Sequence, residues 1–428
     1  MPYSDKVSTT LHLKASILLT RTEFHQIMTT YSITLKEASI MRYFKLSLKL
    51  LMVAVMCLLA SINAVSGQSK TEGGLQTLFI GTYTGPKSEG IYSMQFNPEN
   101  GKLSNLSVAA KTESPSFLAL DIPGKKLYCV NEVSIFKGEK AGGVSSFTLK
   151  TDGKLELVNQ ESSVGTGPCH LSISKDRTHI IAVNYGGGST CMLPVDPMGK
   201  LSKASDFIQH KGTRMIKGKL ETPHAHSVQI SADGKYAVIA DLGFDKIFIH
   251  EIDTKSGKLT PFKVPFLETR PGAGPRHLAF HPSGKHLFVV NESNSTVTAF
   301  RWSPDTKDFK TLATASTLPK DFKGNNSTAE IVVHPNGKTI YASNRGHNSI
   351  CVFNFDSEKE TLEATGHGAE KISTPRNFTL HPSGKWLLVG NQASNSVAVY
   401  KVGTDGALSF SELFQDIPNP ICLRFWIQ

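Results

Sequence analysis

Five ionisable side chains that interrupt a repetitive sequence could together bind an anion and move a proton. They comprise one imidazole, one carboxylate and three guanidinium groups, and they are His226, Arg276, Glu292, Arg345 and Arg376. A guanidinium group binds carboxylate or phosphate through a planar fork, and a histidine or glutamate beside it can transfer a proton. The ionisable neighbours that we expect close by are His170, His224, His277 and Glu330. The combination indicates a site for a small anionic substrate, if the fold brings these residues together.

An internal repeat supplies the elements that must position these residues. The segment His277–Asn291 (HLAFHPSGKHLFVVN) recurs as Glu330–Asn344 and Asn377–Asn391, and weaker copies occupy 117–131, 170–184 and 227–241. Each unit begins with a short apolar strand and a tight turn, which in most copies contains Gly-Lys, and three further strand patterns follow. Four short strands in a unit of about 45–55 residues are typical of a β-propeller blade.

The two ends of the repeat array are complementary. First strands start near Pro115, Pro168, Pro223, Pro275, Thr328, Pro375 and Pro420, and the last of these is followed only by the strand pattern of residues 421–426. The body of the chain begins instead with a second-strand pattern at 77–80, followed by a third at 90–96 and a fourth at 103–109. We therefore predict an all-β fold: a seven-bladed β-propeller with four antiparallel strands per blade, closed by a C-terminal innermost strand that joins the N-terminal strands. An open array of β-sandwiches is the alternative.

Residues at the start of a first strand and at the end of a second strand should lie on the same face of every blade. The first set contains Ser116, Cys169, His226, Arg276, Ala329, Arg376 and Ile421. The second set, which follows a recurring Asn, contains Glu132, Tyr185, Leu242, Glu292, Arg345 and Gln392. The Asn recurs too regularly to be specific to one site, so we interpret it as structural. The charged members should meet at the mouth of the central channel, although solvated loop charges and internal salt bridges would give the same pattern.

The N-terminal region has a different character from the repeat. Arg42, Lys45 and Lys49 precede the apolar stretch of residues 50–60, and small residues follow at 64–67. This pattern predicts a signal peptide over 41–67, cleaved near residue 67, with an uncleaved membrane anchor as the alternative. Residues 1–40 form a possible upstream extension before the true start methionine, and 75–428 should form the single propeller domain. The mature protein would be exported, either periplasmic or secreted, without a stable membrane span.

Composition and isolated motifs exclude several other functions. The formal net charge of +10 is diluted over a long chain and is raised by the N-terminal leader, so we do not predict nucleic-acid binding. The cysteines show no metal-ligand spacing and fit strand interiors as buried small hydrophobic residues. His281, His334 and His381 recur in a His-Pro turn and belong to the scaffold. We predict no metal and no cofactor.

Several segments resemble the propeller-type lactonase family, which includes seven-bladed 6-phosphogluconolactonases and a fungal carboxy-muconate lactonizing cyclase. They are Leu78–Thr84 (LFIGTYT), Gly274–His277 (GPRH), His281–Lys285 (HPSGK) and Val289–Glu292 (VVNE), and the resemblance extends from about residue 75 to 426. The resemblance implies that His226, Arg276, Glu292 and Arg345 are catalytic and that a lactone ring is opened without a metal. Two arginines would bind the anionic group and stabilise the oxyanion, and Glu292 or His226 would be the general base.

The substrate is less defined than the family. The resemblance favours a 6-phosphogluconolactonase-like hydrolase. An exported enzyme, however, would not meet 6-phosphogluconolactone, which is made in the cytoplasm. We therefore describe the substrate more broadly, as a small anionic sugar lactone or a related acid. Two other functions remain open: a non-catalytic propeller that binds a partner, and a cyclase that acts on muconate-type diacids. The charged character of the expected mouth favours the enzyme over the binding module.

Overall fold

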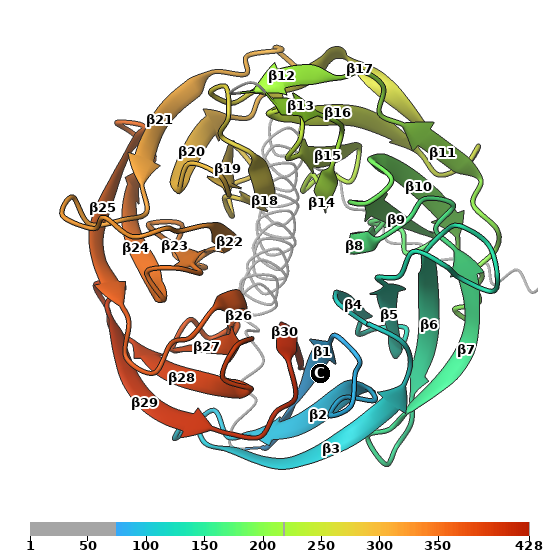
Figure 1. The fold of residues 1–428 in the computed structure, drawn as a ribbon, viewed down its shortest axis with the longest axis horizontal. Coiled ribbons are helices and arrows are strands. Elements are labelled where there is room, and N and C mark those ends of the chain that lie inside the picture. Colours follow the sequence, from blue (N-terminus) through green and yellow to red (C-terminus); the bar gives the residue numbers. More distant parts are fainter. Residues whose placement is uncertain (1–73, 217–218, 428) are drawn as a thin grey trace, which may run out of the picture. The chain divides into compact units, whose positions relative to one another are not determined.

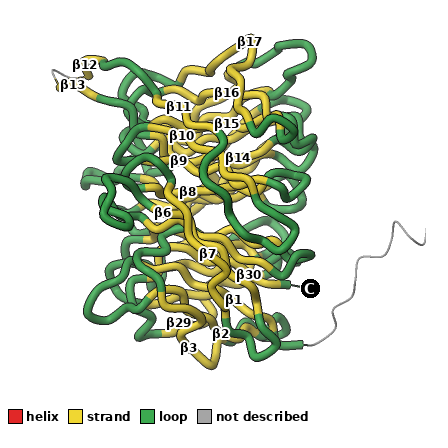
Figure 2. The backbone as a smooth tube through the Cα atoms, turned by 90° about the vertical axis from the view of Figure 1, so that its right-hand side faces the viewer, coloured by secondary structure: helices red, strands yellow, loops and turns green. Residues whose placement is uncertain are grey.

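The computed structural model describes residues 74–216 and 219–427, which form a ring of β-sheets around a central channel (Figure 1). Seen from the side, the ring consists of strands joined by loops (Figure 2). Seven sheets have four antiparallel strands each, which confirms the predicted seven-bladed propeller. No helix in these residues is long and apolar enough to cross a membrane. The predicted extension (1–40) and signal peptide (41–67) lie outside the described residues.

Each blade contributes one strand to each of four concentric positions. The innermost strands are β4 (Leu118–Asp121), β8 (Pro168–Ile173), β14 (Ala225–Ile230), β18 (Pro275–Phe280), β22 (Thr328–Val333), β26 (Pro375–Leu380) and β30 (Pro420–Trp426). The second strands are β1 (Gln76–Thr82), β5 (Lys126–Asn131), β9 (His179–Asn184), β15 (Tyr236–Asp241), β19 (His286–Asn291), β23 (Thr339–Asn344) and β27 (Trp386–Asn391). From β5 onward, every residue of these second strands is buried, because a neighbouring blade packs on each face.

The two outer positions are more exposed. The third strands are β2 (Gly90–Phe96), β6 (Gly143–Leu149), β10 (Ser189–Pro194), β16 (Lys246–Asp253), β20 (Thr296–Arg301), β24 (Ser349–Asp356) and β28 (Ser396–Val402). The outermost strands are β3 (Leu103–Lys111), β7 (Leu155–Ser162), β11 (Asp206–Gln209), β17 (Lys258–Glu268), β21 (Thr311–Ser316), β25 (Thr361–Gly368) and β29 (Leu408–Phe414). A small hairpin, β12 (Arg214–Ile216) with β13 (Lys219–Glu221), stands outside the repeat, and the sequence pattern did not predict it.

The ring closes as predicted, with strands from both ends of the chain in one blade. The blade order is β3-β2-β1-β30, and β30 pairs antiparallel with β1 from Thr77↔Trp426 to Thr82↔Pro420. Asn377 in the preceding blade accepts a hydrogen bond from the backbone N–H of Leu423, at 2.8 Å. Closure therefore pairs the edge that an open ring would leave exposed.

The recurring turn residues connect one blade to the next, so their repetition has a structural cause. Nε2 of His281 donates to the carbonyl of Gly337 at 2.9 Å, and Nε2 of His334 donates in the same way to Gly384 at 3.1 Å. Gly337 and Gly384 have φ of 71° and 72°, and a Cβ on either would meet the histidine ring at 2.5 Å. Only glycine fits both the positive φ and this close approach.

The recurring Asn is also structural. Nδ2 of Asn344 donates to the carbonyl of Thr317 at 2.8 Å, and Nδ2 of Asn391 donates to the carbonyl of Lys371 at 2.9 Å. Each bond fixes the end of a second strand to the segment that enters the blade. The side chain after each Asn is consequently held at the rim of the channel.

Candidate active site

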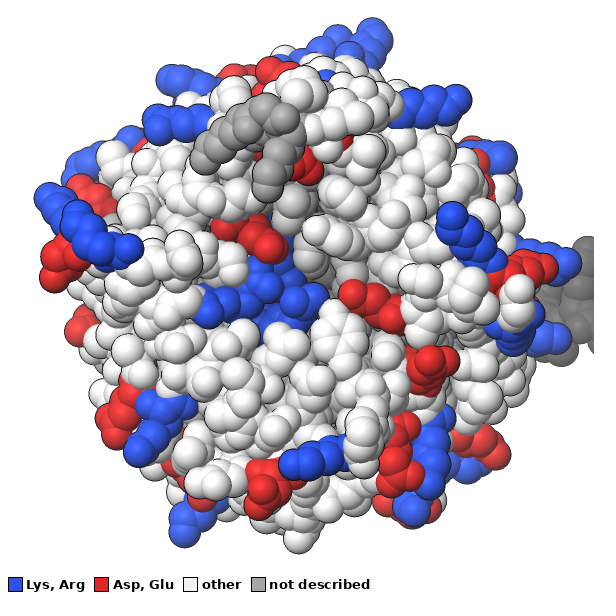
Figure 3. All heavy atoms as spheres, in the orientation of Figure 1, with Lys and Arg blue, Asp and Glu red and all other residues white. Residues whose placement is uncertain are grey.

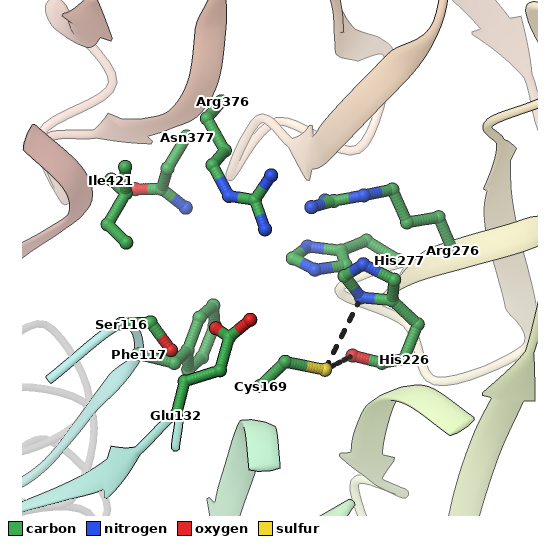
Figure 4. A pocket seen from close by; sticks show the side chains of 10 residues that line it. All are labelled: Ser116, Phe117, Glu132, Cys169, His226, Arg276, His277, Arg376, Asn377 and Ile421. Atoms are coloured by element: carbon green, nitrogen blue, oxygen red, sulfur yellow. Dashed lines mark hydrogen bonds between the residues drawn. The ribbon is translucent and has the colours of Figure 1, made fainter. Parts of the chain in front are cut away.

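A β-bulge at the start of the innermost strands directs side chains into the channel. In β18, Pro275 pairs with Asn291 but His277 pairs with Val290, so Arg276 is an extra residue in the ladder. The same shift occurs near the start of β8, β14, β22, β26 and β30. Bulges often re-aim side chains next to functional sites. Here both Arg276 and His277 line one pocket at the mouth (Figure 4).

Three of the predicted residues form one ionic cluster. Arg276 Nε lies 2.8 Å from Glu292 Oε2, and Arg345 Nη2 lies 2.9 Å from the same oxygen. Backbone carbonyls hold both guanidinium groups, because Arg276 Nη1 donates to Ala329 at 2.6 Å and Arg345 Nη2 donates to Thr328 at 2.8 Å. The carboxylate of Glu292, at the end of a second strand, thus binds Arg276 from the innermost strand of its own blade and Arg345 from the next blade.

The charges in this cluster are poorly compensated. Burial, followed by repulsion from Arg345, lowers the pKa of Arg276 to about 10, which still leaves it protonated at neutral pH. Burial alone would raise the pKa of Glu292, but Arg276 and Arg345 lower it below its usual value. Glu292 is therefore a weak base that is engaged by two guanidinium groups, and it is suited to fixing their positions.

We expect Glu292→Gln to lower the free energy of unfolding by about 1–3 kcal/mol, because two guanidinium groups lose their shared counter-charge in a largely buried place. The Glu292 side chain is 26% exposed, so the loss should stay below that of a fully buried pair. Glu156→Gln is the matched control, since Glu156 is 63% exposed in its ion pair with Lys150 and its loss should cost less than about 1 kcal/mol. Chemical denaturation measures both, and equal losses would contradict the assignment.

Opposite this cluster, a hydrogen-bond network links Arg376 to Tyr83 and Glu132, two residues that we did not select from the sequence. Nη2 of Arg376 donates to the Tyr83 hydroxyl at 2.9 Å, and that hydroxyl donates to Glu132 Oε1 at 2.9 Å. The guanidinium group also lies 5.4 Å from the centre of the Tyr83 ring. Although burial alone would lower the pKa of Arg376, Tyr83 and Glu132 raise it. The carboxylate of Glu132 faces the arginines across the pocket (Figure 4).

His226 and Cys169 form the third side of the pocket. The Cys169 thiol donates to the carbonyl of His226 at 3.2 Å, and its sulfur lies 3.8 Å from His226 Nδ1. Burial, followed by the charge of Arg276, lowers the pKa of His226 well below its usual value, so the ring is neutral at pH 7. Burial also raises the pKa of the Cys169 thiol far above neutrality, so it is not a thiolate nucleophile.

His277 and Glu330 lie deeper and form the floor. His277 Nδ1 donates to Glu330 Oε1 at 2.8 Å, and Asn377 Nδ2 donates to the other carboxylate oxygen. The His170 ring packs against Phe117 at an interplanar angle of 33°, with ring centres 3.8 Å apart. A second cavity lies on the other side of this floor, where His170, Glu330 and Arg424 lie among apolar and uncharged residues of the innermost strands.

The structure thus separates the predicted residues by depth. His226, Arg276, His277 and Arg376 line the mouth pocket, and Glu292 binds both Arg276 and Arg345. His170 and Glu330 lie in and below the floor. His224 is held at the rim instead, where Nδ1 donates to the carbonyl of Tyr185 at 3.0 Å and the two rings stack. It does not line the pocket, because Asp241 Oδ1 accepts a hydrogen bond from its backbone N–H and holds the chain there.

Electrostatically, the mouth favours an anion. Figure 3 shows basic side chains gathered in the central hollow of this face, with acidic side chains beside them. Three guanidinium groups (Arg276, Arg345, Arg376) face two carboxylates (Glu132, Glu292). Within residues 74–216 and 219–427, no cluster of three or more His, Cys, Asp or Glu side chains is arranged to hold a metal ion. The site can bind an anionic or polarised oxygen on one side and accept a proton on the other.

This fold and site define a class of protein, and the chain belongs to the family described as "Lactonase, 7-bladed beta-propeller", which matches residues 77–425. It is 31% identical over 349 residues to a 6-phosphogluconolactonase of Bacillus subtilis, covering 81% of this chain and 97% of that protein. A 6-phosphogluconolactonase of Formosa agariphila is 32% identical over 308 residues, covering 71% and 86%. The structure of the periplasmic gluconolactonase of Pseudomonas aeruginosa is similar, with a TM-score of 0.77, 27% identity, and coverage of 82% and 99%.

Proposed function

We propose that this protein is a hydrolase that opens a sugar lactone, with a 6-phosphogluconolactonase-like activity. The observation that carries the proposal is the convergence of Arg276, Arg345 and Arg376 on one channel mouth that also holds two carboxylates. Hydrolysis of a lactone develops negative charge on the carbonyl oxygen, and positioned donors are most effective where that charge appears. The names of the relatives support the same reaction class.

In the proposed reaction, the guanidinium wall binds the carbonyl oxygen of the lactone and stabilises the oxyanion. Arg276 is the main candidate, because it is 2% exposed, lines the pocket and is fixed by the Ala329 carbonyl. Glu292 holds Arg276 and Arg345 in position and does not take the proton of the attacking water. Arg376 reaches the pocket from the other side and can bind a second oxygen of the substrate.

The relatives differ in the substrate that their names state: two act on the phosphorylated lactone, and the periplasmic protein acts on gluconolactone. The excess of guanidinium groups should attract a phosphorylated lactone electrostatically. A protein exported by the segment 41–67, as we also propose, would instead meet unphosphorylated sugar lactones. N-terminal sequencing of the mature protein tests the predicted cleavage, and a chain that retains residues 1–67 would refute cleavage near residue 67.

We expect the purified protein to accelerate acid release from δ-gluconolactone and from its 6-phosphate, each corrected for spontaneous hydrolysis. If the positive mouth steers the substrate, kcat/KM for the 6-phosphate should be the higher value at low salt and should fall more steeply as salt is added. Muconate-type diacids serve as the test of lactonizing activity. Failure to exceed the spontaneous rate with any sugar lactone would contradict the proposed function.

A further inference from the structure

The proposed reaction needs a group that takes a proton from water, and the two candidates suggested by the sequence are poorly placed for it. Glu292 Oε2 already lies within 2.9 Å of two guanidinium groups. His226 stands beside Arg276 in the buried wall, where an imidazolium would be repelled by the guanidinium group. A base must bind the proton that it removes, so neither side chain suits the role.

Glu132 differs from both because one of its oxygens is buried and unused. Oε1 accepts the hydrogen bond of Tyr83, whereas Oε2 is inaccessible to solvent and has no hydrogen-bond partner. A buried carboxylate oxygen without a donor is costly, so such an atom in a native pocket requires an explanation. We infer that the missing donor is the water molecule that takes part in the reaction, since the carboxylate lines the pocket and faces Arg376 (Figure 4).

The surroundings of Glu132 hold the carboxylate in one orientation. Tyr83 follows β1 and fixes Oε1, and Arg376 in β26 fixes Tyr83, so two other blades position a residue that follows β5. The titratable groups that face Glu132 are Tyr83, Arg376 and Cys169. Both Tyr83 and Cys169 are neutral at pH 7, because burial raises the pKa of each, and this leaves Arg376 as the neighbouring counter-charge.

We propose that Glu132 is the general base of the lactonase reaction, with Tyr83 and Arg376 as the residues that position it. This inference rests on the proposed function. Oε2 takes a proton from a water molecule while the water oxygen bonds to the lactone carbonyl carbon, and the carbonyl electron pair moves to the oxyanion held by the arginines. The C–O bond of the ring then breaks, and the proton on Glu132 passes to the departing ring oxygen. The product is the hydroxy acid, and Glu132 is again ionised.

Glu132→Gln keeps the shape of the side chain and removes the basic oxygen, so we expect kcat to fall by about 10²–10³-fold. Binding of gluconate, measured by calorimetry, should change by less than about fivefold, because the arginines are untouched. Glu156→Gln is the matched control, since Glu156 lies in the same blade on β7 and its ion pair with Lys150 is exposed. The control should retain the activity of the unmodified protein.

Two further variants separate catalysis from structure. Glu132→Ala should regain activity when formate or acetate is added, because a small carboxylate can occupy the vacated place, and a purely structural defect would not respond in this way. Tyr83→Phe removes the donor to Oε1, so the acidic limb of the kcat/KM profile should move to higher pH. Glu132→Gln activity within threefold of the control, or an absence of rescue by either acid, would overturn the proposal. Inactivity of the unmodified protein on every lactone would instead refute the proposed function itself.

Discussion

Replacement of Arg276 by glutamine should lower kcat/KM for the lactone by at least about 10²-fold, the typical loss when one oxyanion donor is removed. Arg276 is held by Ala329 and Glu292 and lines the pocket. Arg345 cannot replace it without moving away from the carbonyl of Thr328, to which its Nη2 donates at 2.8 Å. The loss should appear mainly in kcat, because charge develops on the carbonyl oxygen only as the reaction proceeds.

Arg301→Gln is the matched control for this experiment. Arg301 also binds a carboxylate, with its Nη2 2.6 Å from Glu360, but it lies on β20 away from the channel. It should retain full activity even if the protein loses some stability. Steady-state kinetics of both variants, with thermal unfolding as a check of folding, decides the matter. Equal activity of the two variants would remove Arg276 from the mechanism.

Mild acid should destabilise the propeller strongly through the three histidines of the channel wall. Burial is the main cause that lowers the pKa of His170, His226 and His277 in the folded protein. The unfolded chain therefore binds more protons below about pH 6.5, and stability must fall as the pH falls. Between pH 6.5 and 5.5 each histidine removes at most about 1 kcal/mol, so the three together remove up to about 3 kcal/mol.

Glu330 acts in the same direction at lower pH. Burial alone would raise its pKa, but His277 lowers it, so the stability that Glu330 contributes is present above its unfolded pKa and is lost as acid protonates it. Denaturant unfolding at pH 7.5, 6.5 and 5.5 measures the slope, and His170→Gln should reduce it by about a third. A stability that stays constant from pH 7.5 to 5.5 would contradict the neutral, buried state of these rings.

The ring could be predicted from the sequence because its repeat is dictated by contacts between neighbouring blades. The glycines at 337 and 384 recur since each must accommodate a histidine of the previous blade. The closure by β30 could be predicted for a related reason, because the missing strand at one end of the array matched the surplus strand at the other. The hairpin β12–β13 has no counterpart in other blades, so the repeat gave no signal for it.

The site could be predicted only in part, because its members depend on neighbours that are distant in sequence. Alignment of the repeats identified Glu292 and Arg345, which follow equivalent second strands of adjacent blades, and Arg276, which starts the innermost strand of the Glu292 blade. The three side chains meet in space. The same alignment contained Glu132, but nothing local showed that Tyr83 would leave one of its oxygens free. The bulges, which bring both Arg276 and His277 to the pocket, are also invisible in a pattern of alternating residues.

The location of the pocket at the closing blade has a consequence for biosynthesis. Tyr83 follows β1 and Ile421 belongs to β30, so the pocket borders the seam at which early and late parts of the polypeptide meet. A ribosome releases β30 only after it has made every other strand of the ring. The nascent chain therefore carries all of its reactive side chains before it has a competent site, and a prematurely terminated product would be inert even with each of those side chains present.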